Sequence, residues 1–325
     1  MALFLCLTFI SNKKIIFIIH FSALFYYIGL HIKIRHGCTM QSLTQNLIDL
    51  LNVKQIDQYL FQGQCTQLFG SHLFGGQILG QSLIAASKTT DRPAHSLHAY
   101  FIRSGRTDAP ILFKVENLRD GRSLATRQVH AIQDGEVIFS AMISFAKPEE
   151  GLNYQLPEPE YPSPETLMSE QEYKQMIFDD IPEYMRKTIM RQFDLRMHPI
   201  NPINPFHPKK AEAKYAEYMQ TFDPIPPEHD QVMIHQAIIA YYSDYNLLTT
   251  SLRPHSVSYA NGSVRSASLD HSLHFHHTFK ADEWLLYDMD ATRTSQSRGI
   301  NFGRLWQNGQ LVCSVTQESL MRVPQ

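Results

Sequence analysis

The sequence predicts an α+β fold made of two copies of one unit, and two observations carry that prediction. In each half of the chain, an apolar helical stretch precedes an antiparallel run of strand-like segments. In addition, Ser-Leu-His occurs at residues 96–98 and again at 272–274, and a hairpin dipeptide follows each copy at a similar distance, at 134–135 and at 308–309. Two matches in the same order and at nearly the same offset indicate a duplicated unit.

The composition narrows the class of protein. The chain has 325 residues, of which 43% are apolar, so it is long enough for one large domain or two ordinary ones. The 29 Lys and Arg against 31 Asp and Glu give a net charge of -2, which argues against a protein that coats nucleic acid. The four cysteines form no Cys-x-x-Cys pair, so we expect neither a disulfide framework nor a Cys-rich zinc module, and a reducing compartment is the simpler interpretation.

Residues 1–39 differ in character from the rest. The run Ile15 to Leu30 is almost wholly apolar and slightly short for a membrane span, which takes about 20 residues. Three interpretations stay open: a membrane anchor, a signal peptide without the usual small-residue cleavage site, or an upstream extension of a chain whose translation begins at Met40. We favour the last, because leucines recur at helical spacing from Leu43 to Leu51, as in a soluble amphipathic helix.

The first predicted unit, an N-terminal domain, covers residues 40–147. Its helix lies at 75–88 and shows an apolar stripe that includes Ile78 and Leu83. Asp-Gly dipeptides at 120–121 and 134–135 predict hairpin turns, because such turns need positive φ. The strands are expected at 95–102, 111–118, 123–133 and 136–145.

The second unit follows a proline-rich linker. Residues 148–185 form the linker, which begins as extended chain because proline fixes φ and cannot donate to a sheet. Residues 165–190 look helical, and the C-terminal domain is placed at 186–325. Its helix, within 232–248, is apolar almost all round and should be deeply buried. Its strands are expected at 272–280, 283–293, 298–306 and 310–321.

Few residues point to chemistry without reference to a family. The chain has no Gly-x-Ser-x-Gly elbow, phosphate-binding loop or dinucleotide fingerprint. Gly75 and Gly76 at a helix start indicate close packing, or else backbone N–H groups that face an anion or an oxyanion. The histidines of the 271–277 run suit an ordinary polar face better than a metal site. Asp244 lies in the most apolar helix, so it must be paired, structural or functionally poised.

Seven stretches of the chain, in order, resemble the acyl-CoA thioesterase II family. The stretches in the first half are Leu73-Phe-Gly-Gly-Gln-Ile-Leu-Gly-Gln, Ser96-Leu-His-Ala-Tyr-Phe and Leu118-Arg-Asp-Gly-Arg-Ser-Leu-Ala-Thr-Arg. Those in the second half are Tyr242-Ser-Asp-Tyr-Asn-Leu-Leu, Ser268-Leu-Asp-His-Ser-Leu-His-Phe-His, Glu283-Trp-Leu-Leu-Tyr and Val315-Thr-Gln-Glu-Ser-Leu-Met-Arg. The resemblance runs from about Met40 to Arg322. It implies a double hotdog, in which each of two long helices is wrapped by an antiparallel sheet and the sheets join side by side.

The resemblance also implies an activity and a catalytic trio. Family members hydrolyse fatty acyl-CoA to fatty acid and CoA with an activated water and without metal or cofactor. Their Asp, Thr and Gln match Asp244, Ser268 and Gln317, so this chain keeps the hydroxyl but loses a methyl group. Two further departures are Ser104, where the family has Pro in Arg-Pro-Gly, and His274, where Trp is common. Neither touches the trio.

The remaining site residues are predicted with less support from the pattern. Gly76 and Gln77 are candidates for the oxyanion hole, and His98 is a candidate for substrate binding or general base. Arg119, Arg122 and Arg127 could meet CoA phosphates, although arginine on an exposed strand is more often only solvated.

Two other functions stay open, and the sequence also gives expectations for the partners of the protein and its location in the cell. The same fold could serve a non-catalytic acyl-CoA-binding protein or a dehydratase of 3-hydroxyacyl thioesters. We expect acyl-CoA as the partner molecule, no nucleic acid and a homo-oligomer. The C-terminus carries no Ser-Lys-Leu signal, so a cytoplasmic enzyme is expected, with membrane attachment only if residues 15–30 form an anchor.

Overall fold

The computed structural model describes residues 42–68 and 72–324. The predictions for residues 1–39, an anchor, a leader or an upstream extension, fall outside this range. Within it, no helix is long and apolar enough to cross a membrane. The leucine repeat after Met40 does form a helix, α1 (Leu43–Leu51), which begins at the Ser42 cap and buries Leu47, Ile48 and Leu51.

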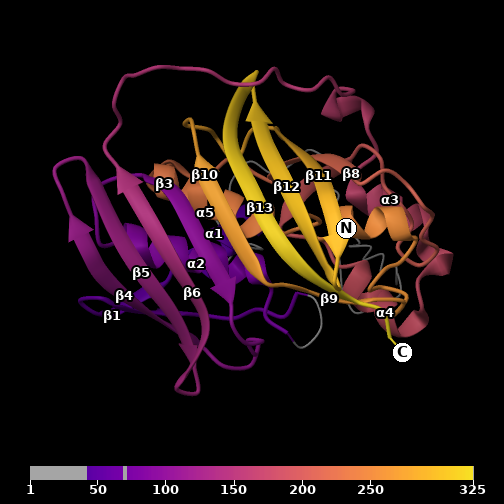
Figure 1. The fold of residues 1–325 in the computed structure, drawn as a ribbon, viewed down its shortest axis with the longest axis horizontal. Coiled ribbons are helices and arrows are strands. Elements are labelled where there is room, and N and C mark those ends of the chain that lie inside the picture. The colour runs from indigo at the N-terminus through magenta and orange to yellow at the C-terminus, as the bar shows by residue number, and fades with distance from the viewer. Residues whose placement is uncertain (1–41, 69–71, 325) are drawn as a thin grey trace, which may run out of the picture. The chain divides into compact units, whose positions relative to one another are not determined.

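The strands of the described residues form one antiparallel sheet, to which both halves of the chain contribute (Figure 1). The order across it is β1-β2-β4-β5-β6-β3-β10-β13-β12-β11-β8-β7, and β9 pairs with β13 beside this path. The first half supplies β1 (Lys54–Asp57), β2 (Leu60–Gly63), β3 (Ala94–Phe101), β4 (Ile111–Asp120), β5 (Leu124–Gln133) and β6 (Glu136–Ala146). The second supplies β7 (Leu195–Pro199), β8 (Lys214–Thr221), β9 (Arg265–Ser268), β10 (Asp270–Phe275), β11 (Leu285–Ser295), β12 (Arg298–Gln307) and β13 (Gln310–Arg322).

The halves meet where the repeated Ser-Leu-His segments pair with each other. In β3 and β10, Leu97 lies opposite Leu273, with Ser96 opposite His274 and His98 opposite Ser272. Both leucines are fully buried. The repeat detected in the sequence therefore marks a local two-fold relation, and the sheets of the two units join side by side through ladder hydrogen bonds.

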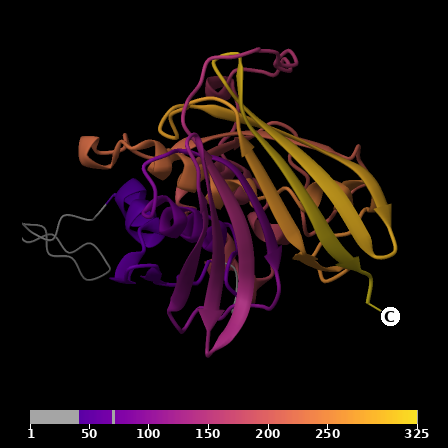
Figure 2. The ribbon, with the colours of Figure 1, turned by 60° about the vertical axis from the view of Figure 1, so that its left-hand side comes forward.

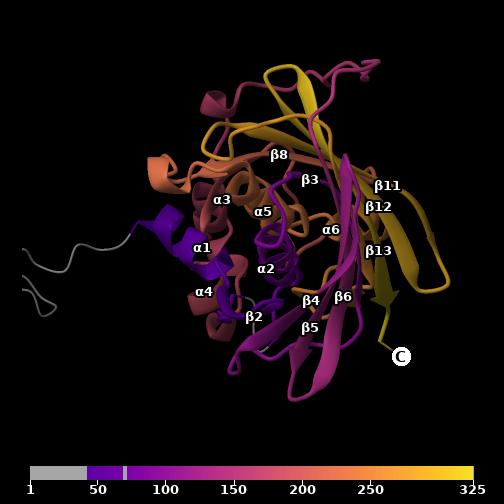
Figure 3. The same ribbon diagram turned by 90° about the vertical axis from the view of Figure 1, so that its left-hand side faces the viewer.

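Two buried helices, α2 (Gly75–Ser87) and α5 (Val232–Ser243), lie on one face of the sheet, which curves around them (Figures 2 and 3). They touch at glycines. A Cβ on Gly76 would lie 1.9 Å from the Tyr241 carbonyl oxygen, and one on Gly80 would lie 2.8 Å from that of Ala237. Close packing, one of the two predicted roles of the glycines, is thus confirmed for this helix pair.

The inter-domain segment is less helical than predicted. Residues 165–190 contain short pieces rather than one helix, because Pro182 ends one turn and caps the next. The pieces between the two buried helices are the 3-10 turns Pro164–Thr166, Phe178–Asp180 and Pro227–His229, with α3 (Glu170–Met176) and α4 (Glu183–Ile189). After α5 come α6 (Thr249–Leu252) and a last turn at Arg253–His255.

Other differences from the predicted elements have local causes. The strand expected at 272–280 ends at Phe275, and β1, β2, β7, β8 and β9 were not predicted. The turns at Asp134-Gly135 and Asn308-Gly309 have the predicted positive φ, but Gly121 does not. At 121–123 the loop is longer than a two-residue turn and closes through the Gly121 N–H, which donates to the Leu124 carbonyl at 2.8 Å. The predicted domain limits, 40–147, 148–185 and 186–325, stay predictions.

Candidate active site

Asp244 stands at a junction of two helix ends. It is the C-cap of α5, immediately after Ser243, where a carboxylate meets the unfavourable end of its own helix dipole. Its carboxylate, however, accepts the backbone N–H of Gly76 in the first turn of α2, whose N-cap residue Phe74 supplies no side-chain cap. The catalytic candidate of the second half therefore caps the helix of the first half.

This approach requires glycine at the start of α2. A Cβ on Gly75 would lie 2.5 Å from Oδ2 of Asp244, well inside any normal contact distance. A Cβ on Gly76 would collide with the backbone of α5. The second predicted role of these glycines, to leave N–H groups open toward an anion, is met here by the Asp244 carboxylate.

Ser268 and Gln317 join Asp244 in one hydrogen-bonded chain. The Ser268 hydroxyl donates to Oδ1 of Asp244 at 3.1 Å, and the Gln317 amide nitrogen donates to Oγ of Ser268 at 2.8 Å. The three come from separate elements: the end of α5, the end of β9 and the middle of β13. Because β9 pairs with β13, with Ser268 opposite Ser319, the hydroxyl and the amide lie on neighbouring strands.

The surroundings favour a basic carboxylate at position 244. Burial raises the pKa of Asp244 above its ordinary value, because the charged form loses hydration. The hydrogen bonds from the Ser268 hydroxyl and the Gly76 N–H oppose this rise and stabilise the anion. A carboxylate with a raised pKa, held by donors on several sides, is suited to accept a proton from water.

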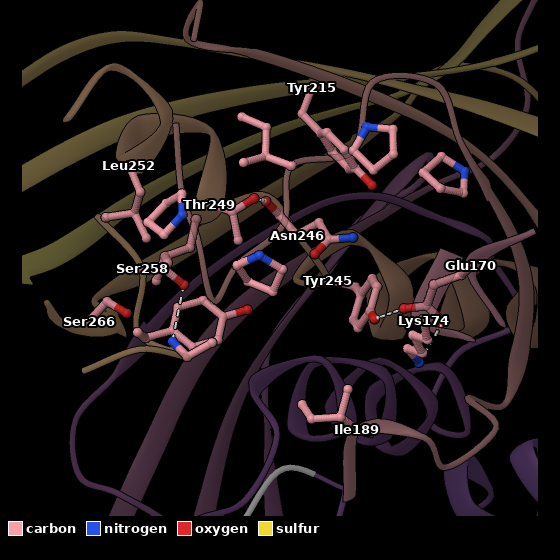
Figure 4. A pocket seen from close by; sticks show the side chains of 18 of the residues that line it. Glu170, Lys174, Ile189, Tyr215, Tyr245, Asn246, Thr249, Leu252, Ser258 and Ser266 are labelled. Carbon is pink, nitrogen blue, oxygen red and sulfur yellow. Dashed lines mark hydrogen bonds and ion pairs between the residues drawn. The ribbon is translucent and has the colours of Figure 1, made fainter. Parts of the chain in front are cut away.

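Asp244 and Ser268 also line a cavity of about 640 Å³. Its walls are mostly apolar and come from the segment between the two units, from α6 and from the loops that follow it; they include Ile177, Ile189, Phe193, Ile203, Leu248 and Leu252. Figure 4 shows this cavity, with Tyr245 pointing toward Glu170. Nζ of Lys174 lies 2.8 Å from Oε2 of Glu170, so the two charged side chains in this wall form an ion pair. The volume is in the range of small-molecule sites.

Comparisons with known proteins show which family the chain belongs to. Residues 186–320 match the family model described as acyl-CoA thioesterase, and residues 66–146 match the acyl-CoA thioesterase N-terminal domain. Acyl-CoA thioesterase 2 of Haemophilus influenzae is 33% identical over 288 residues, which cover 87% of this chain and 99% of the relative. The chain belongs to the acyl-CoA thioesterase family.

Solved structures support the family fold. The crystal structure of acyl-CoA thioesterase II TesB2 from Mycobacterium marinum is similar with a TM-score of 0.69 and 33% identity, over 86% of this chain and 99% of that one. A hotdog protein of unknown function from Alicyclobacillus acidocaldarius has a TM-score of 0.68 at 19% identity, over 86% and 99%, and so speaks for the fold alone. The predicted double hotdog of this thioesterase-family chain is confirmed.

The other predicted site residues, Gly76, Gln77 and His98, have other contacts in the structure. The Gly76 N–H is hydrogen-bonded to Asp244, and the Gln77 N–H donates to the Phe74 carbonyl at 3.1 Å, so both oxyanion-hole candidates have protein partners, and their role stays a prediction. The Gln77 side chain donates to the Gln64 carbonyl. His98 is exposed on the sheet face away from the helices, where it meets Ser272 and the ring of His274. It therefore shares no cavity with Asp244.

Two further expectations change. Arg127 is 1% exposed, and its guanidinium donates hydrogen bonds to Asp120, Thr89 and Asn117, so it cannot bind a CoA phosphate. Gln317, the third member of the predicted trio, is 0% exposed and reaches the cavity only through Ser268. Among the residues described, no group of three or more His, Cys, Asp or Glu side chains could hold a metal ion.

The sequence interpretation missed one residue of this candidate site, His271. It was assigned to a polar face, yet it is completely buried, and its Nδ1 lies 2.6 Å from Oε1 of Gln317. The signal was available in the alternation of the strand, because His271 shares its face with the buried Leu273 and Phe275. A histidine on the inward face of a strand must satisfy two ring nitrogens, which marks it as part of a polar network.

Proposed function

We propose that the protein hydrolyses acyl-CoA thioesters to a free acid and CoA, with Asp244 as general base for a water in the cavity. The observation that carries the proposal is the chain Gln317–Ser268–Asp244, which ends on a partly buried carboxylate in the wall of an apolar cavity. The names of the relatives, which are acyl-CoA thioesterases, support the substrate class.

The reaction needs one proton acceptor that later returns the proton. Asp244 takes a proton from water while the water oxygen bonds to the thioester carbonyl carbon. The tetrahedral intermediate then expels the CoA sulfur as a thiolate, which takes up a proton, and the acid is released. A thiolate is a good leaving group, so a carboxylate base suffices, and correct positioning of the water supplies much of the rate.

Ser268 and Gln317 have a supporting part in this scheme. The Ser268 hydroxyl donates to Oδ1 of Asp244, and the Gly76 N–H also donates to the carboxylate, so the two bonds hold it in one orientation. Gln317 holds the hydroxyl in that direction. The apolar walls of the cavity, between the segment that links the two units and α6, support binding of the acyl chain there.

The decisive experiment compares wild type with Asp244→Asn in an assay for free thiol released from a saturated acyl-CoA. We expect kcat to fall by about 10³-fold, within the range for loss of a general base, while the chain still folds. Asp91→Asn is the matched control, because the Asp91 side chain is 89% exposed on the loop before β3.

The same assay separates the rival functions. A non-catalytic binding protein would release no thiol from the wild-type chain, and a dehydratase would find no hydroxyl to eliminate from a saturated substrate. Full turnover by Asp244→Asn would reject the assignment of the base. A homo-oligomeric state and a cytoplasmic location remain predictions, which gel filtration and cell fractionation of the native protein would check.

A further inference from the structure

The buried ring of His271 connects the proposed active site to the end of α5. His271 lies on β10, and its two nitrogens face different partners. Nδ1 lies 2.6 Å from Oε1 of Gln317, and Nε2 lies 2.9 Å from Oγ of Ser243, the residue directly before Asp244. The ring is 0% exposed, so no solvent can replace either partner.

The direction of every hydrogen bond in this network follows from the carboxylate. Ionised Asp244 only accepts, so the Ser268 hydroxyl must donate to it and the Ser268 oxygen is left to accept. Gln317 must then turn its NH₂ group toward Ser268, and the second N–H of that group reaches Oγ of Ser319 at 3.3 Å.

The rest of the chain of bonds leads to the histidine. With its NH₂ group on the serines, Gln317 presents its carbonyl oxygen to His271, so Nδ1 must carry the proton. Burial lowers the pKa of His271, which favours the neutral ring. In a neutral ring with a protonated Nδ1, the bare Nε2 accepts from the Ser243 hydroxyl at 2.9 Å. The single proton of that hydroxyl then turns away from the Ala240 carbonyl, its other acceptor, which lies at 3.0 Å.

We propose that His271 is a positioning residue of the thioesterase site, whose Nδ1–H tautomer fixes the orientation of the Gln317 amide and thereby turns the Ser268 hydroxyl toward Asp244. The inference rests on the proposed function. If Nδ1 accepted instead of donating, the amide would rotate by half a turn. The Ser268 hydroxyl would then donate to Gln317, and Asp244 would lose a hydrogen bond that sets its orientation.

Asparagine and glutamine at position 271 distinguish this role from simple packing. The Asn amide nitrogen occupies the same place along the side chain as Nδ1, so His271→Asn keeps a donor for Gln317. The Gln amide reaches as far as Nε2, so His271→Gln keeps a partner for Ser243 and removes the donor. Both replacements are neutral amides, which makes them a matched pair, and neither touches the cavity wall.

We expect His271→Asn to keep kcat within about tenfold of wild type, the equivalent of one hydrogen bond, and His271→Gln to lose about 10²-fold, as for a misplaced catalytic group. KM for acyl-CoA should change little in either variant. Equal losses in the pair, or a fully active His271→Gln, would overturn the inference. Asp244→Asn is measured in the same series. If Asp244→Asn stays active, the proposed function is wrong. If Asp244→Asn is inactive and His271→Gln is active, only the role of His271 is wrong.

A second measurement determines the tautomer in the wild-type protein itself. The side-chain ¹⁵N chemical shifts of wild-type protein labelled at histidine distinguish a protonated Nδ1 from a bare one. We expect His271, identified by the signal lost in His271→Asn or by its slow solvent exchange as a buried ring, to carry its proton on Nδ1 at neutral pH. A proton on Nε2 with a bare Nδ1 would contradict the proposed tautomer.

Discussion

The two buried helices of the duplicated fold end in different ways. In the first half, α2 ends at Lys88, whose amine is bound by the Val53 carbonyl and Asn52, and residues 88–93 lead directly into β3. In the second half, α5 ends at Asp244, and the longer stretch 244–269 leads to β10. That stretch contains α6 and β9 and therefore Ser268.

The difference shows how one of two similar units comes to carry the proposed reactive centre. The helix end carries the carboxylate of Asp244 in the second unit and the amine of Lys88 in the first. The longer stretch 244–269 then brings the Ser268 hydroxyl next to that carboxylate. The first unit still contributes, because the N-terminus of α2 provides the N–H that meets Asp244. Its own helix end keeps a structural lysine.

The largest effect is expected where the two units touch. Gly76→Ala would place a Cβ 1.9 Å from the Tyr241 carbonyl oxygen, a backbone atom that cannot move without shifting α5. We expect unfolding free energy to fall by about 3 kcal/mol or more, the upper range for overpacking, as measured by denaturant unfolding. Gly151→Ala is the control, since nothing lies within 4 Å of its Cβ. A Gly76→Ala protein as stable as wild type would show that the two helices are not locked at this point.

The next effect concerns the hydroxyl that only the second unit carries. Ser268→Ala removes the donor to Asp244 and the acceptor for Gln317, so kcat should fall by about 10²-fold, whereas Ser268→Thr should stay within about tenfold. Ser266→Ala, two residues earlier on β9 and also in the cavity wall, serves as control. Steady-state kinetics that rank Ala above Thr would contradict the assignment.

A smaller effect is expected in the pH dependence of kcat and of stability, which Asp244 at the end of α5 should control. Since burial raises the pKa of Asp244, kcat should fall about tenfold per pH unit on an acid limb that lies above the range of an exposed Asp, about pH 4. The same shift means that the ionised carboxylate costs stability above its folded pKa. Asp244→Asn should therefore be relatively more stable at neutral pH, with the advantage lost as pH falls toward the unfolded pKa. An advantage that grew in acid would contradict the raised pKa.

The smallest effect is expected at the helix end of the first unit. Lys88→Met removes the bonds to Asn52 and the Val53 carbonyl, so the free energy of unfolding should fall by about 1 kcal/mol. Turnover should not change, because this end of the fold has no part in the proposed reaction. A loss of kcat at constant stability would mean that the first unit contributes to catalysis in a way that the comparison does not allow.

The sequence predicted the repeated elements well and the added ones poorly. Hairpin turns at 134–135 and 308–309 and the helix after Phe74 follow from local chemistry, and the structure confirms them. Strand β9 escaped because Arg265-Ser-Ala-Ser has no apolar alternation and is held only by its pairing with β13. Edge strand β7, which ends at Pro199, was hidden among prolines that suggested broken structure.

The site was predictable only in part. Asp244 was conspicuous as a carboxylate in an apolar helix, but spacing alone could not bring it to Ser268 and Gln317, and only the family resemblance suggested that grouping. The hydrogen-bond partners of the trio, His271 and the Gly76 N–H, depend on contacts between distant strands and helices. Such contacts are set by the tertiary fold, which a one-dimensional pattern does not encode.

The pairing of Leu97 with Leu273 has a consequence for the protein in pieces. If either unit were produced alone, its seam strand would become a bare edge with unpaired N–H and C=O groups, the kind of surface that recruits other strands. A fragment of the first unit would also keep the Gly76 donor without its carboxylate, and a fragment of the second the reverse. Co-expressed fragments should therefore reassemble across this seam, and turnover should return only with reassembly.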